Sequence, residues 1–221
     1  MCHSITRRKF TRLTLGTLIA PKFAFAQNTD AIQALHGRLD IDSFKAKTAA
    51  RLSAKEDQTI FRVGEDAFLT DAAFEAELEL DDSGVLGKFK ILSGQTLGVL
   101  KSRNNRQTAL LMPNATASIR GTGFYVNVNI SQPNDYICCC YGHIAFQNAR
   151  SGERQQLKNS YHNATAINDK GDFITPEFDY PYGHYDDELV LLESALGRKP
   201  HWELPQSKMH FLSPKPLPVL G

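Results

Sequence analysis

Three consecutive cysteines, Cys138 to Cys140, are the residues whose type and spacing point most directly to chemistry. They lie in the segment Tyr136–Tyr141, whose residue types predict a β-strand, and successive side chains of a strand point to opposite faces. Cys138 and Cys140 are therefore expected on one face and Cys139 on the other. A Cys-x-Cys pair on one face can supply two thiolates to a single metal ion, especially where a bulge draws the side chains together.

The same cysteines do not predict a disulfide framework. The fourth cysteine of the chain is Cys2, which lies in a segment that we expect to be removed on export. A disulfide needs Cα atoms about 4.4–6.8 Å apart with converging side chains, so adjacent cysteines form only strained bonds. Metal chemistry or simple burial therefore explains the three cysteines better than cross-linking does.

The first 26 residues have the three parts of an export signal. These are the twin arginines Arg7-Arg8, the apolar run Leu13–Ala20 and the small-x-small cleavage site Ala24-Phe25-Ala26. The apolar run is far shorter than the roughly 20 residues that a membrane-spanning helix needs. We predict a twin-arginine signal peptide over residues 1–26, a periplasmic mature chain that starts at Gln27, and no membrane span after cleavage. The alternative, a basic amphipathic helix that stays on the chain, does not explain the cleavage site.

Removal of this segment changes the charge of the protein. The whole chain has 25 basic and 24 acidic residues, and the mature chain keeps 20 basic and 24 acidic ones, a formal charge of −4. Such a chain has no basic stripe for a phosphate backbone, so nucleic acid is excluded as a partner. The twin-arginine route moves folded proteins, often with a cofactor already inserted, which favours a metal site.

The spacing of apolar residues divides the mature chain into three parts. Ile32, Leu35 and Leu39 recur at helical spacing and predict a helical lead-in over residues 27–58, with its helix between Asp30 and Ser53. From residue 59 to 175, short apolar or alternating runs are separated by turn residues, which predicts a mainly β domain, an antiparallel roll or sandwich.

Residues 176–221 are predicted to form a short C-terminal helix and an extended tail. Asp186-Asp187 can cap a helix that ends at Gly197. From Pro200 onward the chain is rich in proline, which predicts an extended segment and excludes a helix.

Two segments within the predicted β domain resemble a known family. The run Met112–Tyr125, which contains Ile119-Arg120-Gly121-Thr122-Gly123, resembles the "TPtAtigIRGTGfyve" signature of FecR-like periplasmic domains. Lys88–Leu100 resembles the strand-and-"sG" segment of the same family. The resemblance covers roughly residues 64–147 and implies a FecR-like β domain over residues 59–175.

The cysteine segment is similar to a subgroup of that family. Tyr136–Gly142 resembles the "YxCxCYG" stretch of small exported FecR-like proteins. The best-known FecR-like proteins are membrane-spanning regulators that pass a signal from an outer-membrane receptor to a sigma factor. The resemblance therefore implies a binding or sensory module. We expect this chain to lack the cytoplasmic segment and the membrane helix of those regulators.

The subgroup also implies a ligand set. Its "H-x-A" and "H-x-D-x-E-L" motifs are matched here at His162 and His184. With Cys138 and Cys140 they form a two-sulfur, two-imidazole set, and His143 is a substitute ligand. Such a set suits one transition metal ion, either iron or zinc in tetrahedral form or reduced copper. If the site exists, the ligand atoms should lie within roughly 4 Å of one another, or slightly further apart without metal.

Two alternatives remain open at this stage. The cysteines can be small buried hydrophobic residues and the histidines ordinary loop residues, in which case the protein is a non-enzymatic exported module that binds an unknown protein or small ligand. A Cys–His hydrolase, with Cys140 as nucleophile and His162 as base, has no strand-to-helix elbow to support it. The expected function is thus an exported FecR-like binding or sensory protein, with a metal-binding, redox-active protein as the alternative.

Overall fold

The computed structural model describes residues 31–43, 48–104, 106–128, 134–159, 161–175, 182–202 and 212–220. The predicted signal peptide, residues 1–26, lies outside the described residues. Among those that are described, no helix combines the length and the apolar character needed to span a bilayer.

Strands dominate the described chain. They are β1 (Ile32–His36), β2 (Leu39–Ser43), β3 (Ala49–Ala54), β4 (Thr59–Val63), β5 (Asp66–Thr70), β6 (Glu75–Leu80), β7 (Leu86–Val99), β8 (Thr108–Leu111), β9 (Ala115–Val128), β10 (Asn134–Asn148), β11 (Arg154–Asn159), β12 (Asn163–Asn168) and β13 (Phe173–Ile174). The helix of the described residues is α1 (Asp186–Ala195). The prediction of a mainly β protein is confirmed.

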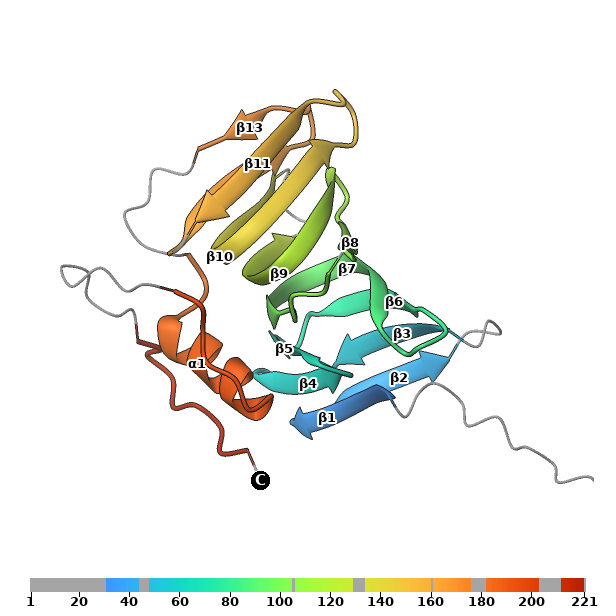
Figure 1. The fold of residues 1–221 in the computed structure, drawn as a ribbon, viewed down its shortest axis with the longest axis vertical. Helices are drawn as coiled ribbons and strands as arrows, with labels where there is room; N and C mark the ends of the chain where they lie inside the picture. The colour runs from blue at the N-terminus through green and yellow to red at the C-terminus, as the bar shows by residue number, and fades with distance from the viewer. Residues whose placement is uncertain are drawn as a thin grey trace, which may run out of the picture.

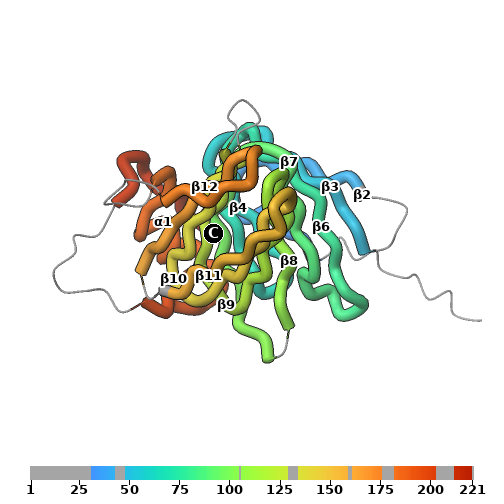
Figure 2. The backbone as a smooth tube through the Cα atoms, turned by 90° about the horizontal axis from the view of Figure 1, so that it is seen from above, coloured from blue at the N-terminus to red at the C-terminus, as the bar shows by residue number. Residues whose placement is uncertain are grey.

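Within the described residues, these strands form one 13-stranded sheet. All of its pairings are antiparallel except β7 with β8. The long strands β7, β9 and β10 hold the sheet together, because β7 pairs with β5, β6, β8 and β9, and β10 pairs with β9, β11 and β12. Figure 1 shows β10, β11 and β13 in one half of the molecule and β1 to β6 in the other. Seen from above in Figure 2, α1 lies on the side of β10 and β12, away from β2, β3 and β6.

The prediction of a helix between Asp30 and Ser53 is wrong where the structure describes these residues. Three strands, β1 to β3, replace it. Gly37 has a φ of +71°, which turns the chain between β1 and β2 and interrupts the apparent helical spacing. In β3, the buried residues alternate with more exposed ones, which is the period of a strand packed on one face.

The two faces of the sheet contribute to separate apolar clusters. The larger cluster contains Cys139 and the side chains of most strands. The smaller one lies between the sheet and α1, and it contains Cys138 and Cys140 together with Leu189 and Leu192 of the helix. The predicted alternation of the three cysteines is therefore confirmed, and the Cys138–Cys140 pair faces the helix.

Helix α1 has the predicted place and length. It begins after Tyr185, whose backbone N–H donates to the Glu188 carboxylate (2.9 Å), and it ends before Gly197, whose φ is +67°. The N-terminal cap is thus Tyr185 with Glu188, and not Asp186-Asp187 as predicted. This leaves the carboxylate of Asp186 available for another contact.

The C-terminal part of the chain is fixed to the helix. Residues 212–220 contain no helix or strand, as expected for the proline-rich tail. The backbone N–H of Ser213 donates to both carboxylate oxygens of Asp187 (2.9 and 3.1 Å). Helix α1 is itself tied to β10, because the hydroxyl of Tyr141 donates to Glu193, which also pairs with Arg198 (2.6 Å).

Candidate metal centre

Four side chains that the sequence singles out converge between the sheet and α1. The structure places one ligand atom each of Cys138, Cys140, His162 and His184 within 4.8 Å of one another. We refer to these four residues as the Cys/His site. They come from β10, from the turn between β11 and β12, and from the segment before α1. A site of this composition could hold a metal ion.

A bulge in β10 brings the two cysteines together. Against β9, Cys139 is opposite Phe124 and Tyr141 is opposite Gly123, so Cys140 is an extra residue with no partner of its own. Gly142 follows with a φ of +93° and a second register shift. The strand nevertheless continues through Gly142 to Asn148. Its local bend directs both sulfur atoms of the pair toward one point.

Contacts of both its backbone and its imidazole ring fix the position of His162. It has a φ of +38°, a left-handed conformation that residues other than glycine rarely adopt. Its backbone N–H donates to the carbonyl oxygen of Cys140 (2.9 Å), which links the turn before β12 to the bulge in β10. Strained conformations of this kind persist where the surrounding structure requires them, and they concentrate at functional sites.

His184 is positioned by a tyrosine and a glycine. Its ring stacks on that of Tyr125, with ring centroids 4.5 Å apart and an interplanar angle of 13°. The preceding Gly183 has a φ of +75°, and a Cβ atom there would lie 2.3 Å from the hydroxyl oxygen of Tyr125. The loop can therefore pass Tyr125 only with glycine at this position.

Two of the distances inside the site are close to the edges of a tetrahedron around a metal ion. Nδ1 of His162 lies 3.6 Å from Sγ of Cys138 and 3.1 Å from Nε2 of His184. Around an ion with metal–nitrogen bonds of about 2.0–2.1 Å and metal–sulfur bonds of about 2.3 Å, tetrahedral edges are about 3.3 Å between nitrogens and about 3.6 Å between nitrogen and sulfur. Small movements would therefore suffice to ligate one ion.

The ring nitrogens that face away from the site have acceptors. Nε2 of His162 lies 2.9 Å from Oδ1 of Asp186, and Oδ2 of the same carboxylate accepts a hydrogen bond from the Tyr161 hydroxyl (2.7 Å). Nδ1 of His184 lies 2.9 Å from the carbonyl oxygen of Tyr182. Acceptors at these positions place a proton on the outer nitrogen and leave the inner one as a ligand. Carboxylates and carbonyls hold metal-bound histidines in the same way.

The two cysteines of the site have pKa values that are shifted in opposite directions. Burial disfavours the Cys138 thiolate, but a hydrogen bond from Cys140 and the neighbouring His184 and His162 outweigh burial and lower the pKa of Cys138 well below its usual value. Burial, together with Cys138, raises the pKa of Cys140 well above its usual value. Burial also opposes protonation of His162, yet its hydrogen bonds with Asp186 and Cys138 raise its pKa. Metal binding would therefore release a proton from Cys140, which has to lose it to ligate as a thiolate, whereas Cys138 is already deprotonated.

The site is closed to solvent. Cys138, Cys140 and His184 are 0% exposed, and the side chain of His162 is 7% exposed. A metal ion here would have four protein ligands and no open position, the arrangement of structural and electron-transfer sites as opposed to hydrolytic ones.

The remaining candidates from the sequence fall outside this arrangement. His143 does not belong to the Cys/His site, and its Nε2 lies 3.4 Å from Oε1 of Gln156. The hydrolase pair of Cys140 and His162 is not favoured, because Cys138 is the cysteine in contact with the histidine. The raised pKa of Cys140 also keeps it as a thiol.

Three residues of the centre were not identified from the sequence. Asp186 was interpreted as a helix cap, although its place two residues after His184 in the second histidine motif could have marked it as a partner of the site. Tyr161 directly precedes His162, which is a weak signal. Tyr125 pairs with Cys138 across β9 and β10, and only the register of these strands reveals it.

Comparisons with known proteins leave the family open. No protein-family model and no curated protein matches the chain. Two crystal structures of a "putative anti-sigma factor" from Parabacteroides distasonis align with it at a TM-score of 0.39 and 8% identity. Each alignment covers 66% of this chain and 58% of that protein. A similarity this distant supports no argument about function.

Proposed function

We propose that this chain is an exported β-domain protein that binds one transition metal ion in the Cys/His site. One observation carries the proposal: four buried ligand atoms converge while the outer ring nitrogens of both histidines already have acceptors. Buried cysteines and histidines that serve only for packing do not need this orientation. Two thiolates and two imidazoles suit zinc, iron or reduced copper in tetrahedral form.

The bound ion would act as a cross-link. The four ligands come from three separated segments, and Asp186 adds the start of α1. Because the unfolded chain holds no preformed site, the binding free energy of the ion adds to the stability of the folded protein. The closed coordination favours a structural ion, or one that exchanges electrons without binding substrate.

A binding or sensory role in the periplasm is the second candidate. The resemblance to FecR-like domains and the twin-arginine signal support it, and the structure adds one specific observation. A cavity adjoins the Cys/His site, and its lining includes Tyr125 and Gly183, the two residues that position His184. A ligand in that cavity would contact the residues that hold His184.

The test is the metal content of protein exported by its own signal and recovered from the periplasm, measured by inductively coupled plasma mass spectrometry. We expect one equivalent of a single transition metal per chain. Cys138→Ala should abolish it, and Cys139→Ala is the matched control, because the two cysteines are adjacent and both 0% exposed. Metal-free wild-type protein that is folded, or equal metal loss in both variants, would refute the proposal.

A further inference from the structure

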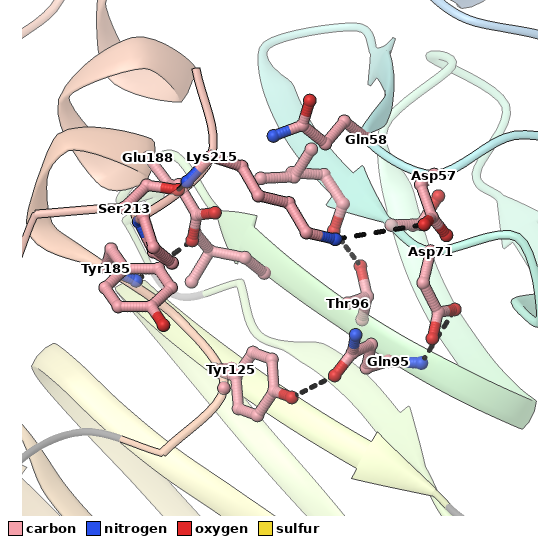
Figure 3. Close-up of a pocket in the computed structure, with 15 residues that line it drawn as sticks. Asp57, Gln58, Asp71, Gln95, Thr96, Tyr125, Tyr185, Glu188, Ser213 and Lys215 are labelled. Carbon is pink, nitrogen blue, oxygen red and sulfur yellow. Dashed lines mark hydrogen bonds and ion pairs between the residues drawn. The ribbon is translucent and has the colours of Figure 1, made fainter. Parts of the chain in front are cut away.

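A cavity of about 310 Å³ lies next to the Cys/His site (Figure 3). Tyr125 separates the two, since its ring stacks on His184 and its hydroxyl donates to Gln95 in the cavity wall. Gly183 and Tyr185, on either side of His184, also line the cavity. A molecule bound here would therefore contact the segment that positions a proposed metal ligand.

The charge of the lining selects the kind of ligand. Three carboxylates, those of Asp57, Asp71 and Glu188, line the cavity with one ammonium group, that of Lys215. Figure 3 shows Asp57 and Asp71 at one end and Glu188 at the other. Burial raises the pKa of Asp71, and it raises that of Glu188 to about 7, because both carboxylates have lost water without gaining a full cationic partner. A ligand with a cationic group at each of its ends would give the carboxylates at both ends of the cavity the positively charged partner that they lack.

The chain already places one ammonium group in this cavity. Nζ of Lys215 lies 3.8 Å from Oδ2 of Asp57, and the bond of Ser213 to Asp187 holds this part of the tail in the cavity wall. The pair is weak, because the two side chains are 66% and 65% exposed and the distance exceeds that of a hydrogen bond. Lys215 thus marks a position for an ammonium group that a ligand can take over.

We propose that the cavity binds a linear aliphatic diamine, with one ammonium group between Asp57 and Asp71 and the other near Glu188. The cavity fits a short apolar chain with two cationic ends. Its carboxylates lie at both ends, Thr96 and Gln95 contribute hydroxyl and amide groups, and tyrosine rings complete the lining. Binding of the diamine in the cavity changes the position of His184 in the Cys/His site through the ring of Tyr125, which stacks on His184. This transmission rests on the proposed metal function, whereas the binding itself does not.

Calorimetry on metal-free protein at about 0.15 M salt tests the binding, because this salt screens contacts with exposed carboxylates. The probe is 1,4-diaminobutane, and 1,4-butanediol is its uncharged counterpart. We expect saturable one-to-one binding of the diamine and none of the diol. Asp71→Asn should weaken binding at least tenfold, whereas Asp82→Asn, which removes the same charge from an exposed turn outside the cavity, should not.

A second pair of variants separates a specific site from a general attraction to acidic surface. Lys215→Ala should tighten diamine binding severalfold because it removes the resident ammonium group. Lys170→Ala, in the turn between β12 and β13, should leave it unchanged. Equal effects within either pair of variants, or equal binding of diol and diamine, would overturn the diamine site.

Cobalt(II) in the Cys/His site tests the transmission. The thiolate-to-cobalt absorption band should shift on addition of the diamine. It should not shift in a Tyr125→Leu variant that still binds both cobalt and the diamine. A band that does not respond overturns the transmission alone. Absence of any band overturns the proposed metal function and the transmission together, while calorimetry still decides the diamine site.

Discussion

Replacing Asp186 with asparagine tests whether the metal centre depends on the orientation of His162. The carboxylate accepts from two donors, His162 Nε2 and the Tyr161 hydroxyl, and Asp186 is 1% exposed. Asparagine offers one acceptor oxygen, so its amide group would face one of the two donors. The variant should lose about 1–3 kcal/mol of unfolding free energy from the mismatched buried pair.

The larger effect should be on metal binding. Loss of a hydrogen-bonded partner of a metal-bound histidine typically lowers metal affinity about 10–100-fold, which corresponds to about 1.4–2.8 kcal/mol. A competition titration with a chromophoric chelator at pH 7 measures this change. Asp187→Asn is the control, because Asp187 contacts the tail at Ser213 and not the histidine, and its metal affinity should equal that of wild type. Wild-type affinity in Asp186→Asn would refute the role of this carboxylate.

Three further predictions concern other parts of the molecule. Burial raises the pKa of Asp135 to about 6, so the folded state holds this proton more tightly than the unfolded state does. The resulting contribution to stability is present below about pH 4 and lost by about pH 6, amounting to about 3 kcal/mol at most. Asp135→Asn should therefore flatten the dependence of unfolding free energy on pH in this window, as urea titrations would show, and an unchanged dependence would contradict it. Gly183→Ala should weaken metal binding at least tenfold through its clash with Tyr125, whereas Gly197→Ala, which has a similar φ and no atom within 4 Å of the added Cβ, should bind metal normally. Replacing Arg7 and Arg8 with lysine should retain the precursor in the cytoplasm, and mature protein should begin at Gln27; uncleaved protein in the periplasm would contradict this.

The sequence predicted the features that depend on short-range pattern. The alternation of the three cysteines follows from the period of a strand, and it correctly separated Cys139 from its neighbours. The C-terminal helix followed from its local start and stop signals, the acidic pair Asp186-Asp187 and Gly197. The segment of β1 to β3 was misassigned because Ile32, Leu35 and Leu39 fit a helical period, although the turn at Gly37 lies among them.

The features that depend on strand register and side-chain contacts could not be predicted. Whether the histidines reach the Cys138–Cys140 pair depends on how β10 pairs with β12 and on where α1 docks. The acceptor role of Asp186 depends on the cap, because Tyr185 and Glu188 take over the function that the sequence suggested for it. The cavity is formed by residues from six separate parts of the chain, so no local pattern indicates it.

X-ray absorption spectroscopy at the edge of the metal found in the exported protein is the most direct test of the metal centre. The proposal predicts a first shell of two sulfur atoms at about 2.3 Å and two nitrogen atoms at about 2.0–2.1 Å, with the outer-shell scattering of two imidazole rings. A first shell of oxygen and nitrogen without sulfur, or with a single sulfur atom, would contradict it.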